Sequence, residues 1–111
     1  MHAASFLRHR RTQALVESLA GEIATAARHR VRCRVEDRSR GMSLNVLRGY
    51  VRARAALPVH EQVRARHRSL AELSSPAQQK LVRQATERAV HLVVRDLAGL
   101  EISHPAHRKA A

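Results

Sequence analysis

Residues 75–99 read SPAQQKLVRQATERAVHLVVRDLAG, and this stretch decides the fold. Ser75 has a side chain suited to a helix N-cap, and Pro76 follows at the first helical position, where a missing N–H costs nothing. Gly99 follows the last periodic apolar residue, as is typical of a helix C-terminus. We therefore predict a helix over residues 75–98.

The apolar residues of this helix cover a wide arc. At 100° per residue they spread over about 200°, roughly twice the stripe that a surface helix needs. This width predicts packing on two sides, against the first and second helices of the chain. Asp96 falls inside the arc, at about 60° from Leu81 on the helical wheel. A buried carboxylate needs a partner, so Asp96 is expected to have one.

The composition favours a single all-α domain. The chain has 111 residues, of which 2% are aromatic, so its core must be built from Leu, Val, Ile and Ala. Such a core suits close helix–helix packing, and the length suits one core. The one cysteine, Cys33, excludes an intramolecular disulfide and a thiolate zinc site. We predict a small bundle of about four helices with the last helix central.

Helical periodicity also places the earlier helices. Thr12 and Ser43 are suited to N-caps, because each precedes an amphipathic run. Pro58 is expected to end the second helix, since the residue before a proline is pushed away from helical angles. The predicted helices cover residues 12–31, 43–57, 59–70 and 75–98.

The segment 30–46 has two interpretations. Val31, Cys33 and Val35 alternate with arginines, and residues 42–46 alternate as well, a pattern typical of a short β-hairpin. A lone two-stranded hairpin is marginal in water, so we favour a fraying helix end followed by a loop. The predicted organisation is a basic N-terminal arm, a helical domain and a basic C-terminal tail, over residues 1–11, 12–98 and 99–111.

A second charged residue falls on an apolar arc. Arg54 lies in the middle of the apolar face of the predicted helix 43–57, as Asp96 does in the last helix. We predict that Arg54 and Asp96 form a structural ion pair between these helices. The alternative is that each side chain reaches solvent from the last turn of its helix.

The sequence gives little support to catalysis or metal binding. It contains no Gly-rich phosphate loop, no Gly-x-Ser-x-Gly elbow and no His-Glu-x-x-His motif. His60 with His67, and His104 with His107, lack a third ligand at a suitable spacing. Cys33 between two arginines is a candidate nucleophile, although a single thiol is more often an apolar filler. We expect no enzyme activity, no cofactor and no metal.

The charge points to a polyanionic partner. The formal net charge is +12, and nearly all cationic residues are arginine, whose planar fork binds two phosphate oxygens at once. A GC-rich coding sequence explains arginine in place of lysine, but not the excess over acidic residues. We predict a non-enzymatic protein that binds nucleic acid, DNA or RNA, mainly through phosphate contacts. The candidate contact residues are Arg28, Arg30, Arg32, Arg34, Arg48 and Arg52.

Two other interpretations stay open. In the first interpretation, the basic surface is solvated and binds no partner. In the other, the wide apolar arcs make the chain a helical interaction or oligomerisation module, which binds an acidic protein or a second copy of itself. No stretch is long and apolar enough to cross a membrane, and the N-terminus lacks a secretory apolar region. We therefore expect a cytoplasmic protein with no membrane partner.

Overall fold

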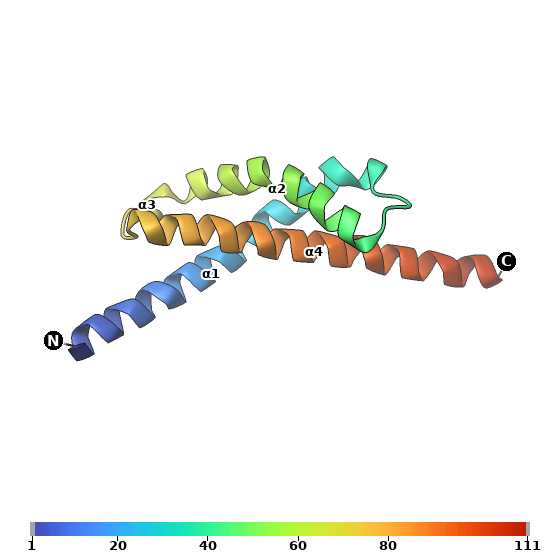
Figure 1. The fold of residues 1–111 in the computed structure, drawn as a ribbon. Coiled ribbons are helices and arrows are strands. Elements are labelled where there is room, and N and C mark those ends of the chain that lie inside the picture. Colours follow the sequence, from blue (N-terminus) through green and yellow to red (C-terminus); the bar gives the residue numbers. More distant parts are fainter. Residues whose placement is uncertain (1, 111) are drawn as a thin grey trace.

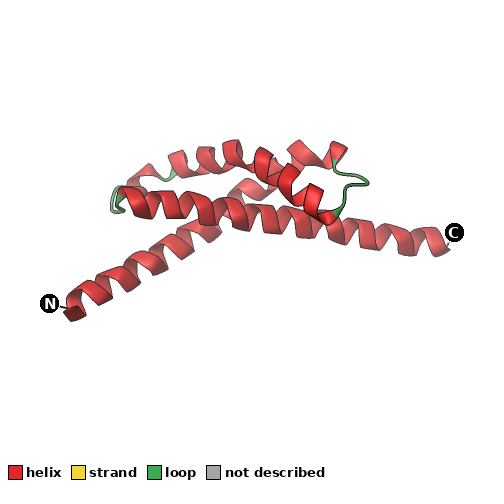
Figure 2. Cartoon of the chain, in the orientation of Figure 1, coloured by secondary structure: helices red, strands yellow, loops and turns green. Residues whose placement is uncertain are grey.

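The chain folds into an elongated all-α bundle, as predicted (Figure 1). The computed structural model describes the backbone of residues 2–110 and the side chains of residues 5–99. Within residues 2–110 the backbone is helical apart from short turns, and contains no strand (Figure 2), so the hairpin interpretation of 30–46 is wrong. In chain order the elements are α1 (His2–Val35), the 3-10 helix η1 (Glu36–Arg38), α2 (Leu44–Ala65), α3 (His67–Leu70) and α4 (Ser75–Ala110).

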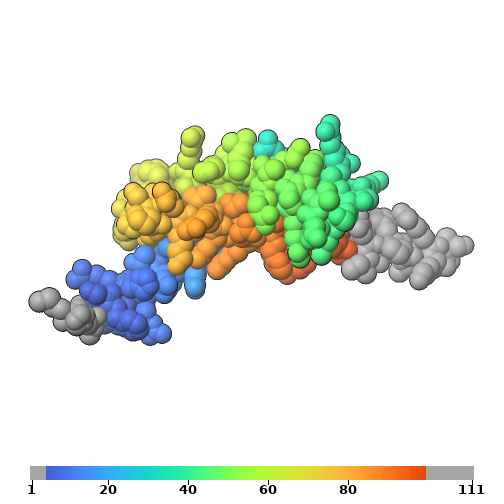
Figure 3. Space-filling view, in the orientation of Figure 1, coloured from blue at the N-terminus to red at the C-terminus, as the bar shows by residue number. Residues whose placement is uncertain are grey.

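The last helix is the central element, also as predicted. α4 packs against both α1 and α2, which in turn contact each other. The molecule measures 67 × 25 × 20 Å, because the first part of α1 leaves the bundle at one end and α4 extends to the other (Figure 1). In Figure 3 the early residues of α1 project away from the body. Contact on two sides explains why the apolar arc of α4 is so wide.

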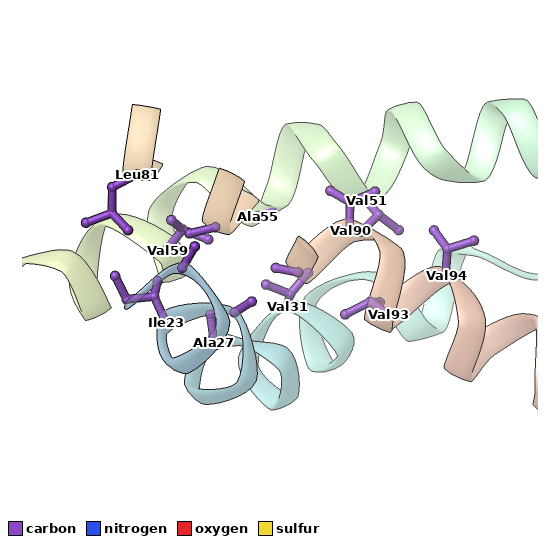
Figure 4. Packing of buried hydrophobic residues seen from close by; sticks show 14 of the residues in the cluster. Ile23, Ala27, Val31, Val51, Ala55, Val59, Leu81, Val90, Val93 and Val94 are labelled. Carbon is purple, nitrogen blue, oxygen red and sulfur yellow. The ribbon is translucent and has the colours of Figure 1, made fainter. Parts of the chain in front are cut away.

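The core is aliphatic throughout. Ile23 of α1, Val59 of α2 and Leu81 of α4 are each fully buried and lie in the same region of it (Figure 4). The buried residues of α4 repeat at three- and four-residue spacing, which keeps them on the covered faces. They are Leu81, Ala85, Ala89, Val90, Val93, Val94 and Leu97.

The predicted helix boundary at Pro58 is wrong. α2 continues through Pro58 to Ala65, so the predicted third helix, 59–70, is divided between α2 and the short α3. A proline inside a helix loses one backbone hydrogen bond and costs about 3 kcal/mol. Pro58 and Val59 are both buried, and the helical path keeps their apolar surface in the core. Tertiary packing therefore outweighs the local preference.

The ends of α1 and α4 also differ from the prediction. α1 begins at His2, so residues 2–11 of the basic arm extend this helix, and residue 1 lies outside the described residues. α1 continues to Val35 because Val31 and Val35, four residues apart, are both buried, whereas Cys33 is exposed. α4 passes through Gly99 to Ala110, so the predicted stop at Gly99 is wrong, and residue 111 of the predicted tail again lies outside.

Two turns connect the long helices. Ser43 caps α2 as predicted, its Oγ accepting a hydrogen bond from the N–H of Val46 at 3.4 Å. The cap of α4 is Ser74 instead of Ser75, because the N–H of Ala77 donates to Ser74 Oγ at 3.3 Å. In the turn before α2, Gly41 has a φ of 81°, the one positive φ in the described backbone. Glycine takes this left-handed conformation without the penalty of a Cβ.

Candidate nucleic-acid interface

The six predicted contact arginines do not form one surface. They form three pairs with i, i+4 spacing, two on α1 and one on α2, and most of them bind a carboxylate of the same chain. Three of these contacts join different helices, and we call them the interhelical ion pairs. These are Arg28–Asp96, Arg30–Glu61 and Arg52–Glu87, which link α1 to α4, α1 to α2 and α2 to α4, respectively.

Arg28 holds the carboxylate that the sequence placed inside the apolar arc. Its Nε donates to Asp96 Oδ2 at 2.6 Å, and its Nη2 donates to Asp96 Oδ1. The Asp96 side chain is 13% exposed. The hydrogen bonds from Arg28 lower the pKa of Asp96 against the opposing effect of burial, and the charges of Arg28, Arg32 and Arg95 lower it further. Asp96 therefore has a partner, as expected.

The predicted identity of that partner is wrong. Arg54 does not bind Asp96; its guanidinium lies over the ring of Tyr50, 3.8 Å from the centroid. A half-buried arginine on an apolar face is stabilised there by the face of an aromatic ring. A helical wheel gives the direction of a side chain around its own helix, but it does not identify the neighbouring helix that the side chain contacts.

Two more predicted arginines are also neutralised. Arg52 donates from Nε and Nη2 to the two oxygens of Glu87, at 2.7 and 2.9 Å, and these bonds lower the pKa of Glu87. Arg32 lies 3.5 Å from Glu36, one helical turn further along the chain. Among the predicted contact residues, only Arg34 and Arg48 have no described carboxylate within 4.0 Å.

Two groups of arginines without a described carboxylate partner lie near the two ends of α2, and others lie along α1 and α4. In the connection before α2 lies the corner cluster, defined as Arg38 and Arg40, both exposed, in η1 and in the loop. Arg34, in the last turn of α1, instead lines a pocket with Leu57, Pro58 and Glu61 of the second half of α2. Asp37 lies in the same corner as Arg38 and Arg40 and reduces its net charge. At the other end of α2 lies the distal cluster, defined as Arg64, Arg66 and Arg68, in a segment, 62–70, that contains no acidic residue.

Two of the three side chains of the distal cluster are available for binding. Arg64 and Arg68 are exposed, and no described group binds their guanidinium groups. Arg66 is half-buried and donates to the side chain and the carbonyl oxygen of Gln62, at 2.8 and 3.2 Å. α2 has 22 residues, so its two ends are about 33 Å apart at 1.5 Å per residue. In Figure 3, side chains of the teal segment before α2 and of the C-terminal part of α2 project from the upper edge of the body.

The described side chains include two aromatic rings, and an arginine lies over one face of each. The chain has one Phe, one Tyr and no Trp. Arg10 lies over the ring of Phe6, 5.4 Å from the centroid, as Arg54 lies over Tyr50. Stacking of unpaired bases requires aromatic rings, of which this chain has few, so this surface is better suited to a phosphate backbone.

The remaining candidate groups do not assemble into a metal site. Among the side chains of residues 5–99, no three of His, Cys, Asp or Glu come together in a way that holds a metal ion. Cys33 Sγ lies 3.6 Å from Nε2 of His29. The His67 ring lies 3.4 Å from the carbonyl oxygen of Arg64, and the side chains of His104 and His107 lie outside the described residues.

In the described part of the chain, no helix has the length and apolar character that crossing a bilayer requires. Comparisons with protein-family models, curated proteins and solved structures give no match to this chain. The candidate interface therefore depends on the residues themselves.

Proposed function

We propose that this protein binds double-stranded nucleic acid through phosphate contacts of the corner and distal clusters. One observation carries the proposal. Two groups of arginines with exposed members and no described carboxylate partner lie near the two ends of α2, whereas the arginines of the interhelical ion pairs are neutralised. A free guanidinium binds a phosphate without first breaking an ion pair, so the binding free energy of a polyanion is expected to be most favourable at the clusters.

The spacing of the clusters favours a duplex. The helix between them, α2, is about 33 Å long, which is close to one turn of B-form DNA, about 34–36 Å. Two clusters near its ends contact phosphates on one side of a duplex, one turn apart. One Phe, one Tyr and no Trp leave few rings on which unpaired bases could stack, which disfavours recognition of single strands. Contacts of this kind position a protein on the backbone and carry no base sequence, so the proposed binding is sequence-tolerant.

Fluorescence anisotropy with a labelled duplex tests the proposal. The salt concentration is varied from about 50 to about 200 mM, since the slope of log affinity against log salt counts the phosphates contacted. The test variants are Arg38→Ala with Arg40→Ala, and Arg64→Ala with Arg68→Ala. The matched control is Arg48→Ala with Arg95→Ala, which removes two exposed arginines outside both clusters.

We expect each cluster variant to reduce the salt slope by about 2 on a duplex of about 20 base pairs, and the control to change it by less than about 1. A duplex of about 6 base pairs spans roughly half a turn, so it should bind more weakly and should not engage both clusters. If the control and cluster variants lose affinity equally, binding depends on total charge and the proposed interface is wrong. Equal affinity for the two duplex lengths contradicts the one-turn spacing.

A further inference from the structure

A second basic surface lies between α2 and α4, distinct from the two clusters. These helices leave a groove of about 440 Å³ between them. Its floor is apolar: Val90 and Val94 are nearly buried, Leu44 is 50% exposed, and Ala98 is half-buried. Apolar surface of this kind does not help to bind a phosphate backbone. It indicates a partner that also brings apolar side chains.

The rim of the groove is cationic. Arg48, His91 and Arg95 line it and are exposed, and no described carboxylate lies within 4.0 Å of either arginine. The one acidic residue of the lining, Glu87, is already bound by Arg52 through two hydrogen bonds. The groove is therefore an apolar channel with excess positive charge along its edge. The N-terminal end of α2, at Leu44, adds the partial positive charge of a helix start.

We propose that this groove binds an acidic amphipathic helix of another protein. A helix placed along the groove presents apolar side chains, three and four residues apart, to Leu44 and Ala98. Its flanking carboxylates then reach Arg48 and Arg95 on the rim. Charge complementarity selects this occupant over a second copy of the chain, because each copy has a net charge of +12 and two copies repel each other.

The proposal is independent of nucleic-acid binding, because it depends on different residues. It requires Leu44 and the rim arginines, whereas the duplex proposal requires the corner and distal clusters. The two proposals therefore predict opposite patterns for the same set of variants. A variant at Leu44 weakens helix binding and leaves duplex binding unchanged, while a variant of the distal cluster does the reverse.

The probe is a labelled synthetic peptide of about 18 residues, with leucines on one helical face and glutamates beside them. A scrambled peptide of the same composition has the charge without the apolar stripe. Binding is measured by fluorescence anisotropy for wild type, for Leu44→Ser, and for Arg48→Glu with Arg95→Glu. The matched control is Arg64→Glu with Arg68→Glu, which makes the same charge change at the far end of α2. Circular dichroism melts establish that each variant is folded; Leu44 is half exposed, so Leu44→Ser leaves the core intact.

We expect the rim reversal to weaken peptide binding at least about 10-fold, and Leu44→Ser to weaken it about 5-fold, as expected from the loss of apolar contact area. The distal reversal should weaken binding less than about 3-fold, through the loss of long-range attraction alone. Equal binding of the scrambled peptide, or equal loss in the rim and distal reversals, would overturn the proposal. So would wild-type affinity in Leu44→Ser.

Discussion

Truncation of Leu81 tests whether the α1–α2–α4 core holds this chain together. Leu81 is 0% exposed, in the same region of the core as Ile23 and Val59. Leu81→Ala removes three carbon atoms, worth about 2.4 kcal/mol at about 0.8 kcal/mol each. The cavity left behind raises the expected loss to about 3–4 kcal/mol. Domains of this size have about 5–15 kcal/mol in total, so the variant loses a large part of its stability.

Leu57→Ala is the matched control, because it removes the same atoms from a side chain that is 54% exposed. Its expected cost is below about 1 kcal/mol. Urea denaturation followed by circular dichroism should show a midpoint about 2 M lower for Leu81→Ala, with an unchanged m-value of about 1.5–2 kcal/mol/M. If the two variants differ by less than about 1 kcal/mol, the assignment of Leu81 to a close-packed core is refuted.

Three further substitutions test local features. Because the pKa of Asp96 is lowered, this carboxylate stabilises the fold above the ordinary pKa of 3.8, and the stabilisation is lost as the pH falls through the lowered pKa. In Asp96→Asn the unfolding free energy, measured by urea titration at several pH values, should therefore fall less steeply below about pH 4. Gly41→Ala, at a φ of 81°, should cost about 1–2 kcal/mol in a thermal melt. Gly49→Ala, where nothing lies within 4 Å of an added Cβ, should instead gain about 0.5–1 kcal/mol, and a loss would contradict the exposed helical position.

Helical periodicity predicted the fold class. The errors at residues 30–46 and at Pro58 arose because packing against other helices decides between local structures that the sequence allows. A spacing of four residues satisfies both a strand of period two and a helix of period 3.6. Val31 and Val35 fit either pattern, and Cys33, exposed in the structure, is the residue that separates them. At Pro58 the local preference of the residue before a proline predicts a helix end, but the helix continues because Pro58 and Val59 are buried in the core. Both outcomes depend on what a segment packs against.

The candidate interface was less predictable than the fold. The ion pair between Arg32 and Glu36 has the i, i+4 spacing that sequence can reveal. The partners in the interhelical ion pairs are 68, 31 and 35 residues apart, and only the packing of the helices brings them together. The sequence therefore shows where the arginines are, but it does not show which of them have no carboxylate partner in the folded chain. Arg38 has no carboxylate three or four residues away, but Arg40 has Glu36 and Asp37 at these spacings, so sequence spacing alone does not mark the corner residues as free.

The distribution of carboxylates, more than the number of arginines, determines where this surface is positive. Eight acidic residues have described side chains, and four of them bind an arginine. Three of those four lie in the interhelical ion pairs, so the same contacts that join the helices also neutralise the arginines that make them. Asp96 is shielded from solvent, so its pair with Arg28 is screened less by salt than exposed charges are. Added salt should therefore weaken the proposed polyanion binding at the clusters well before it weakens this link between α1 and α4.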